Sequence, residues 1–488
     1  MLSITGFGGV NEIGGNKFLI EDEKSRIFLD FGLSFSTANK FLDEFLLPRK
    51  FNGLLDYQEL GLLPKIKGIY RTDFQKHTNP DLPSESLEFD ALFLTHAHAD
   101  HASYVHFLRP DLPIYGSFET FSILKSIEDC GVTGNLDLVT FTNSFNAGKT
   151  KEGKYKRLDS RDPGILIDRD IRKISPTKSV SIGDFQIESI PVNHSLLGAL
   201  AYLIKTPKGD IAFSGDIRLH GKGGDLTWNF AKKCRGVKYL MIEGTRITNP
   251  LIKSELDVQN EISSHIRDTK GLVIANWPSR DTDRLWSFFN ASVENNRKLV
   301  ISSKQAYLLS QLKLCGSDVP DISDSNIRIF IQRRSWGLLG SNAPTDQIER
   351  DYAFVKWELE FLSHKNMVSF RDIKNNYSEF VFRADLFDMT ELIDIRPPDG
   401  SIYIRSMVEP FDDEMQVSEN KLDNWLNHFN LKKVQTHCSG HAPAPDLEKI
   451  VKEIDPQFVI PIHTTNPKKF EDLGFDCIYL ASGESLKI

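Results

Sequence analysis

The chain has 488 residues, of which 40% are hydrophobic and 26% are charged, as is typical of a soluble globular protein with two or more domains. Its net charge of −8 argues against a uniformly basic surface for nucleic acid, and its five scattered cysteines predict neither a disulfide framework nor a cysteine-zinc module. No segment approaches the ~18 apolar residues of a membrane-spanning helix, and the first residues form no targeting signal. We therefore expect a cytoplasmic protein that does not contact a membrane.

The first residues are rich in glycine between positions 6 and 16, where they separate two apolar segments that predict strands. The glycine spacing is close to that of a dinucleotide-binding loop, but no helix follows, so the sequence predicts a tight hairpin. Residues 26–29 then predict a buried strand that ends at Asp30.

A long stretch from 33 to 89 separates this strand from the next one. Its apolar spacings predict short helices at 41–47 and 54–63. The stretch is either a lid over a site or part of the scaffold.

A polar run begins where the predicted inner strand at 92–95 should end, which is where open α/β sheets bind ligands. His96 and His98 are two residues apart and can offer two imidazole nitrogens to one metal ion. Asp100 and His101 follow within reach of a second ion. Histidine is rare, so four such residues together favour a site with two metal ions over an ordinary solvated loop.

The stretch from 142 to 178 shows no apolar periodicity, which predicts an irregular, mobile loop. It is either a loop that contacts phosphates or an ordinary solvated loop. Its basic residues are Lys149, Lys151, Lys154, Lys156, Arg157 and Arg161.

Three further segments combine a buried strand with a polar residue at its end. Residues 181–191 precede His194, residues 211–215 precede Asp216, and residues 238–242 precede Glu243.

From Ser254 the pattern changes to alternating helices and strands, which indicates a second α/β layer. We place an inserted domain at 246–425, between a first domain that begins at 1–245 and its return segment at 426–488.

The return segment contains a predicted strand at 431–434 and another at 458–462 that leads to His463. Between them, His437, Ser439 and His441 share one face of an extended segment. Cys438 then points to the opposite face, which argues against a nucleophilic thiol.

The run from His96 to His101 resembles the HxHxDH signature of the metallo-β-lactamase superfamily, which implies an αββα sandwich with zinc bound at a sheet edge. Residues 8–16 resemble the GGxxEIGxN opening of the ribonuclease J branch. Glu243, the HxSGH run at 437–441 and His463 resemble motifs of the β-CASP group of nucleic-acid-processing enzymes, which carry an inserted α/β domain.

The resemblance implies two zinc ions, with manganese as an alternative. It gives one ion to His96, His98 and His194, the other to Asp100, His101 and His463, and Asp216 to both. Asp30 would lie beneath the ligands and accept the other N–H of a ligand histidine; otherwise it is an ordinary turn residue.

The resemblance also implies a ribonuclease in which a hydroxide between the ions attacks phosphorus. His441 would be the general acid, Glu243 would position it, and Asp100 would take part in catalysis as well as in metal binding. His437 and Ser439 are left for phosphate oxygens, or for a hydrogen-bonded core turn.

Single-stranded RNA is the expected partner, with DNA as the alternative polymer. A small-molecule hydrolase, such as a lactonase or a cyclic phosphodiesterase, and a non-catalytic binding subunit are the competing hypotheses. The sequence leaves open endonuclease against exonuclease action and the oligomeric state, for which a homodimer is one option.

Overall fold

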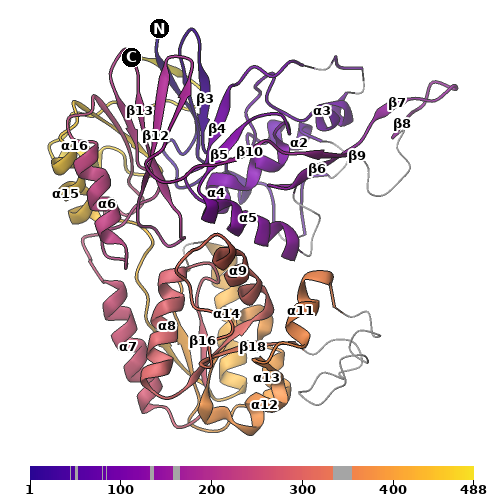
Figure 1. Cartoon of the computed structure of the whole chain (residues 1–488), viewed down its shortest axis with the longest axis vertical. Coiled ribbons are helices and arrows are strands. Elements are labelled where there is room, and N and C mark those ends of the chain that lie inside the picture. The colour runs from indigo at the N-terminus through magenta and orange to yellow at the C-terminus, as the bar shows by residue number, and fades with distance from the viewer. Residues whose placement is uncertain are drawn as a thin grey trace. The chain divides into compact units, whose positions relative to one another are not determined.

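A computed structural model describes residues 1–43, 45–49, 53–79, 81–83, 85–131, 137–157, 165–332, 354–410 and 412–488. The chain divides into two units (Figure 1). Unit 1 comprises Met1–Leu219, Gly223–Leu251 and His441–Ile488, and unit 2 comprises His220–Lys222 and Ile252–Gly440.

The first sheet of unit 1 has seven strands in the order β10-β5-β4-β3-β2-β1-β24. Strands β3, β4, β5 and β10 are parallel, whereas β1 pairs with β2 as the predicted hairpin. Their bounds are β1 (Ser3–Gly8), β2 (Lys17–Glu21), β3 (Arg26–Leu29), β4 (Ala91–Phe93), β5 (Ile114–Gly116), β10 (Ile171–Lys173) and β24 (Ser485–Lys487).

The second sheet of unit 1 has six strands in the order β11-β12-β13-β14-β15-β23. Its last three strands are parallel, so their carboxyl ends lie at one edge. The bounds are β11 (Ser179–Ile182), β12 (Phe185–Pro191), β13 (Leu200–Lys205), β14 (Ile211–Phe213), β15 (Tyr239–Glu243) and β23 (Phe458–Ile462).

The two sheets of unit 1 pack face to face. Side chains alternate between the two faces of each strand, so one strand can contribute both to the core between the sheets and to the core outside them. In β13, Tyr202 joins the core that contains Phe18 and Phe93 of the first sheet. Its neighbour Leu203 lies on the outer face, in the core that includes residues of α6 (Gly224–Lys233) and α15 (Ala444–Ile454) (Figure 1).

Helices also cover the first sheet. Helix α5 (Phe118–Cys130) brings Phe121 to within 3.2 Å of where a Cβ on Gly116 of β5 would lie. Unit 1 is therefore the expected αββα sandwich. The other helices among the described residues of unit 1 are α1 (Phe35–Ala38), α2 (Leu55–Glu59), α3 (Thr72–Thr78), α4 (Ala99–Ala102), a 3₁₀ helix at Ser103–Phe107 and α16 (Lys469–Asp472).

The stretch from 33 to 89 differs in part from the prediction. Helix α2 lies within the predicted helix at 54–63, but residues 41–43 and 45–47 contain no helix. Local turn bonds replace it there, since the Asp43 carboxylate accepts from the backbone N–H groups of Phe45 and Leu46 at 2.7 Å each.

The prediction of an irregular loop at 142–178 is wrong. Strand β6 (Phe141–Ser144) pairs with β9 (Ile165–Asp168), and β7 (Ala147–Lys149) pairs with β8 (Tyr155–Arg157). All four residues of β9 are exposed, so this strand buries neither face and does not need alternating apolar and polar residues. The predicted contact residue Arg161 lies outside the described residues.

Unit 2 contains a seven-stranded sheet in the order β19-β18-β17-β20-β16-β21-β22, in which every pair is parallel. The alternation of strands and helices therefore predicted the right architecture. The strands are β16 (Val273–Asn276), β17 (Lys298–Ser302), β18 (Ile327–Phe330), β19 (Met367–Val368), β20 (Phe380–Arg383), β21 (Ile402–Arg405) and β22 (Lys432–Gln435).

Helix α7 (Glu255–Asp268) begins with the predicted cap, because Ser254 and Asp257 form a reciprocal capping box. The other described helices of unit 2 are α8 (Thr282–Glu294), α9 (Ser303–Leu314), α11 (Leu359–Leu362), α12 (Phe370–Asn375), α13 (Glu391–Ile395), α14 (Asp413–His428) and 3₁₀ helices at Lys356–Glu358, Tyr377–Glu379 and Leu386–Asp388. No described helix of either unit is long and apolar enough to span a bilayer.

The return of the chain to unit 1 occurs later than position 426, where we placed it. Strand β22 pairs with β21, with Ile402 opposite Lys432 and Arg405 opposite Gln435, and so belongs to unit 2. Unit 2 therefore extends to Gly440, and the HxSGH run straddles the boundary between the units.

Candidate metal centre

All the predicted ligands of unit 1 except His194 follow the carboxyl ends of parallel strands, where open α/β sheets place their sites. Asp216 follows β14, and His463 follows β23. His96 and His98 follow β4, whereas Asp100 and His101 lie on α4. His194 is in the loop between β12 and β13.

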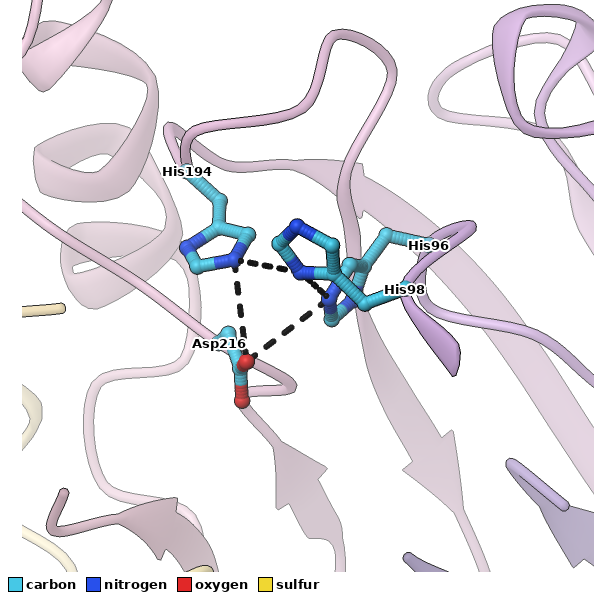
Figure 2. Close-up of side chains that lie close together, drawn as sticks. All are labelled: His96, His98, His194 and Asp216. Carbon is cyan, nitrogen blue, oxygen red and sulfur yellow. Dashed lines mark hydrogen bonds and ion pairs between the residues drawn. The ribbon is translucent and has the colours of Figure 1, made fainter. Parts of the chain in front are cut away.

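The first group of ligands converges on one point (Figure 2). Nδ1 of His98 lies 2.9 Å from Nε2 of His96 and 3.1 Å from Nε2 of His194. Oδ2 of Asp216 lies 3.6 Å and 3.7 Å from the same two Nε2 atoms. A tetrahedral zinc ion holds its ligand atoms about 3.3 Å apart, so these four atoms match one ion.

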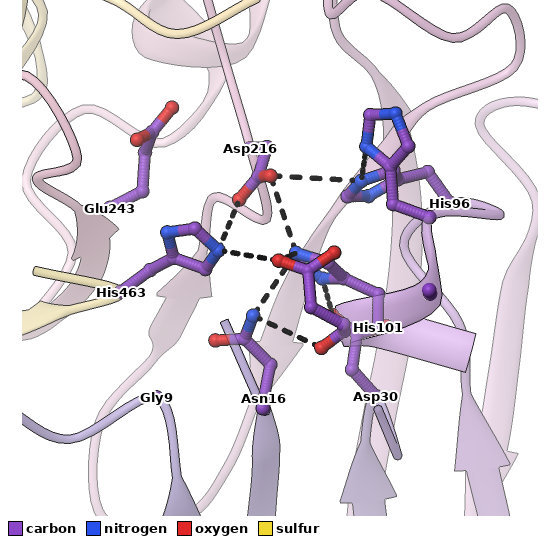
Figure 3. Close-up of polar contacts among 12 residues, drawn as sticks. Gly9, Asn16, Asp30, His96, His101, Asp216, Glu243 and His463 are labelled. Carbon is purple, nitrogen blue, oxygen red and sulfur yellow. Dashed lines mark hydrogen bonds and ion pairs between the residues drawn. The ribbon is translucent and has the colours of Figure 1, made fainter. Parts of the chain in front are cut away.

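The second group contains Asp100, His101 and His463. Figure 3 shows its two histidines on either side of the site. Nε2 of His463 lies 3.1 Å from Oδ2 of Asp100, and Nε2 of His101 lies 3.8 Å from that oxygen. Two imidazoles and a carboxylate form a mixed nitrogen and oxygen donor set, which suits zinc or manganese.

Asp216 lies between the two groups. Its Oδ2 atom is 3.2 Å from Nε2 of His101, and its Oδ1 atom is 3.9 Å from Nε2 of His463. The side chain is almost fully buried, and Oδ1 has no hydrogen-bond partner among the described residues. An unpaired buried carboxylate oxygen is costly unless a cation binds it, so the residues present fit a metal ion at this position.

The protonation states differ between the groups. Burial lowers the pKa of His98 to about 4 and keeps the pKa of His96 and His194 well below the usual value, so this group presents neutral imidazoles. Burial acts in the same direction on His101 and His463, but the carboxylates of Asp216 and Asp100 outweigh it and raise the pKa of both. Those protons must be released when a metal ion binds.

Asp30 lies behind His101. Its Oδ2 atom is 2.7 Å from Nδ1 of His101, while Thr95 donates to the carboxylate from its backbone N–H at 2.7 Å and from its hydroxyl at 2.8 Å. The Nδ1–H group therefore donates to Asp30, which leaves Nε2 to face the second group. The predicted role of Asp30, which is to accept the second N–H of a ligand histidine, requires this contact.

Thr245 holds His463 in a similar way. The Thr245 hydroxyl lies 2.8 Å from Nδ1 of His463 and donates to the His463 carbonyl at 3.3 Å. Sequence reasoning did not assign this role to Thr245, although its position two residues after Glu243 places it at the same strand end.

The glycine-rich hairpin holds the backbone of the second group. Asn16 donates its backbone N–H to the Asp100 carbonyl at 2.9 Å, and His463 donates its backbone N–H to the Gly9 carbonyl at 2.7 Å. The Asn16 amide nitrogen also lies 3.0 Å from Nε2 of His101. The hairpin therefore supports the ligands, a role that the motif alone did not indicate.

Two residues of this site adopt the left-handed backbone conformation that non-glycine residues rarely use. The φ angle is 58° at Asp30 and 49° at His463. Such strain is common at functional sites, where the surrounding structure imposes it.

His441 lies beside the metal ligands and is paired with Glu243. Its Nδ1 atom is 3.1 Å from both carboxylate oxygens of Glu243 and 3.9 Å from Oδ2 of Asp216. Glu243 is fully buried and also accepts from the backbone N–H groups of Ile217 and Thr245. Burial lowers the pKa of His441, but the two carboxylates outweigh it and raise that pKa to about 9.

The two remaining predicted residues, His437 and Ser439, follow β22 in unit 2. Nδ1 of His437 lies 3.1 Å from Nη1 of Arg284, and the Ser439 carbonyl lies 2.8 Å from Nε2 of His220. Neither Arg284 nor His220 was identified from the sequence, because each lies far along the chain from the run that it contacts.

A family model for the β-lactamase superfamily domain matches residues 70–269. The chain is also 25% identical to ribonuclease J of Mycolicibacterium smegmatis over 483 residues, which cover 95% of this chain and 69% of that protein. Residues 70–269, which include the HxHxDH run, therefore match the superfamily that this run predicted.

Other ribonuclease J proteins resemble this chain to a similar degree. The enzyme of Mycoplasma genitalium is 23% identical over 489 residues, which cover 94% of this chain and 67% of that protein. That of Helicobacter pylori is 25% identical over 313 residues, which cover 62% of this chain but only 36% of its own length.

A solved structure confirms the fold. The crystal structure of a protein of unknown function from Enterococcus faecalis V583 superposes with a TM-score of 0.73 at 23% identity, and the match covers 100% of both chains. It carries no information on activity.

The two groups of ligands predict the metal content. We expect the purified protein to bind about two zinc ions per chain and Asp216→Ala to bind neither tightly, because the carboxylate lies between both groups. Elemental analysis after dialysis measures this. Asp184→Ala is the matched control, since Asp184 is exposed and pairs with Lys24 away from the site. A fully loaded Asp216→Ala variant would contradict the shared ligand.

The contact of Asp30 with His101 predicts a selective effect on one ion. In Asp30→Asn the amide can donate to Nδ1 and thereby move the proton to Nε2, which would then be blocked as a ligand. We expect affinity for the ion at the second group to fall roughly 10- to 100-fold. Calorimetric titration of the metal-free protein resolves the two sites, and unchanged affinity at the second site would refute the role of Asp30.

Proposed function

We propose that the chain is a two-zinc phosphodiesterase that cleaves RNA. The observation that carries this proposal is Asp216, a buried carboxylate between two sets of ligands, with the His441–Glu243 pair beside it. The similarity to proteins named ribonuclease J supports RNA as the substrate class. The donor atoms suit zinc, and manganese is the alternative.

In this proposal, His96, His98 and His194 hold one ion, while Asp100, His101 and His463 hold the other. When bound, the two cations would neutralise charge on the phosphoryl oxygens and lower the pKa of a water that attacks phosphorus. Asp216 contributes one carboxylate to both sites. Asp100 is both a ligand and, through its contact with His463, part of the catalytic arrangement.

His441 is the proposed proton donor to the leaving oxygen. Its Nδ1 atom faces Glu243, so the proton on its Nε2 atom is the one that can be transferred. Glu243 keeps the imidazole oriented and basic, as a carboxylate partner does for other catalytic histidines. The exposed fraction of the His441 side chain is 21%, which leaves it accessible to substrate.

His437 and Ser439 are proposed to contact phosphate oxygens. An imidazole N–H and a hydroxyl are both hydrogen-bond donors, as these oxygens require. Cys438 lies between them but is buried, and its thiol donates to Glu255 at 3.1 Å. It therefore takes no part as a nucleophile.

One experiment tests the proposal as a whole. Zinc- or manganese-loaded protein is incubated with end-labelled single-stranded RNA and DNA, each with and without a 5′-monophosphate. Cleavage of RNA supports the proposal, and its products distinguish endonuclease from exonuclease action. Cleavage of DNA alone assigns a DNA nuclease, and hydrolysis of lactones or cyclic phosphodiesters without cleavage of either polymer assigns a small-molecule hydrolase.

The role of His441 predicts an effect that depends on the leaving group. We expect His441→Ala to retain both ions but to cleave RNA ~10²–10⁴-fold more slowly, because the leaving alkoxide needs a proton. A nitrophenyl phosphodiester has a good leaving group and should be affected much less. Steady-state rates on both substrates measure the difference.

Glu243→Gln serves as the conservative comparison for His441→Ala. It should show a weaker form of the same asymmetry, because the amide orients the imidazole less well and supplies no charge. Loss of zinc from His441→Ala, or equal slowing of both substrates, would assign His441 to metal or substrate binding instead.

The exposed lysines of the β7–β8 hairpin predict a contribution to polymer binding. Changing Lys151, Lys154 and Lys156 to Gln should weaken RNA binding and lower the slope of log affinity against log salt by roughly 0.7 for each phosphate that the variant no longer neutralises. Binding titrations at several salt concentrations measure the slope. Hydrolysis of a small phosphodiester should be unchanged.

A matched triple variant controls for net charge. Lys205, Lys208 and Lys232 are also exposed and lie elsewhere in unit 1. If the two triple variants have equal salt slopes, the hairpin is an ordinary solvated surface.

A further inference from the structure

Arg284 is a buried cation at the centre of unit 2. It lies in the first turn of α8, and 0% of its surface is exposed. Its charge is balanced by Glu255 of α7, whose carboxylate accepts from Nε at 2.7 Å and from Nη2 at 3.2 Å. Such a two-point pair fixes the plane of the guanidinium.

The remaining donors of Arg284 reach the HxSGH run and the end of β21. Nη2 donates to the Cys438 carbonyl at 3.1 Å. Nη1 donates to the Ser406 hydroxyl at 2.5 Å and lies 3.1 Å from the Ser406 carbonyl. Nη1 also lies 3.1 Å from Nδ1 of His437. One guanidinium thus contacts both the backbone and an imidazole of the segment that carries the proposed phosphate contacts.

The contact with His437 determines where its proton lies. A guanidinium has five N–H donors and no acceptor, so an Nδ1 atom of His437 that bonds to Nη1 presents its lone pair. In a neutral imidazole the single N–H is then on Nε2. We infer that Arg284 is a positioning residue that fixes His437 in the Nε2–H tautomer, as a permanent donor to a substrate phosphate oxygen. This inference rests on the proposed function.

The electrostatic environment agrees with this geometry. Burial and then the positive charge of Arg284 lower the pKa of His437 to about 3, against the opposing effects of Glu255 and the Ser406 carbonyl. His437 therefore stays neutral at physiological pH and donates without transferring its proton. His441 has a carboxylate partner in place of a cation, so two histidines four residues apart are tuned to different tasks.

The backbone of the run is held on both sides of His437. The Ser406 hydroxyl donates to the Thr436 carbonyl, and His220 lies 2.8 Å from the Ser439 carbonyl. A lysine at 284 could not replace the arginine, because a single ammonium cannot span Glu255, His437 and the Cys438 carbonyl in one plane.

The tautomer can be measured without any assay of activity. Long-range ¹H–¹⁵N spectra of the zinc-loaded protein, with ¹⁵N-labelled histidine, report which ring nitrogen carries the proton, and His437→Gln identifies the signals. We expect a protonated Nε2 and an unprotonated Nδ1 from pH 6 to pH 8. A proton on Nδ1, or titration within this range, would overturn the inference even if the protein cleaves RNA.

Kinetic measurements test whether the tautomer of His437 affects the cleavage of RNA. Arg284→Met is combined with Glu255→Leu, because a buried carboxylate left without its partner could prevent folding. We expect the double variant to lose the single tautomer and to cleave RNA with a kcat/KM reduced roughly 10- to 100-fold, the effect of losing a hydrogen bond to a charged group. Arg284→Lys should also reduce kcat/KM for RNA cleavage.

Arg297→Met is the matched control in the same unit. Arg297 is also buried, and its partners in the described part of the chain are the carbonyls of Gly271, Phe380 and Thr269. Its loss should lower stability and leave both the His437 signals and kcat/KM close to those of the parent.

The decisive comparison uses His437→Gln as the background. The glutamine amide carries N–H donors and has no tautomer to fix, so adding the Arg284→Met and Glu255→Leu pair should reduce kcat/KM little further. An equal further loss would show that Arg284 only supports the fold and would overturn the inference. If the parent cleaves no RNA while the Nε2–H tautomer is present, the proposed function fails and the phosphate-donor role fails with it.

Discussion

The buried carboxylate of Asp216 is the constraint on which the rest of the site depends. Five imidazoles lie 3.2–3.9 Å from its oxygens. A buried carboxylate requires nearby positive charge, which protons or metal ions must supply. Burial and the carboxylates act in opposite directions on the imidazoles of this site. Burial prevails at His98, whose pKa is lowered to about 4, whereas the carboxylates prevail at His101, whose pKa is raised.

The side chains behind the ligands determine what each imidazole can do. A carboxylate behind His101 and a hydroxyl behind His463 accept from Nδ1 and leave Nε2 available. A carboxylate behind His441 retains a proton, and a guanidinium beside His437 moves the proton to the opposite nitrogen. In the proposed function, one residue type would thus serve in metal binding, proton donation and hydrogen bonding, and the partner on its far side would decide between these roles.

The sequence was sufficient to predict those parts of the molecule that leave a local pattern along the chain. Buried strands that end in histidine or aspartate indicated the metal centre, and alternating helices and strands indicated unit 2. The hairpins at 142–178 could not be found in this way, because exposed strands carry no alternation. Strand β22 was assigned to the wrong unit, since pairing with β21 leaves no local signal. Arg284 is separated from His437 by 153 residues, so only the folded structure reveals their contact.

The distribution of the ligands along the chain has a consequence for how the site is assembled during synthesis. The first group is complete once Asp216 has been translated, and its strands β4, β12, β13 and β14 all precede that residue. The second group lacks His463 until the whole of unit 2 has left the ribosome. Unit 1 also lacks β23 and β24 until then, so neither of its two sheets is complete before unit 2 has been synthesised. Because domains fold as units, the early residues of the first group must wait for the end of the chain before the domain that holds them can finish folding. A chain truncated within unit 2 would lack both His463 and the last strand of each sheet of unit 1.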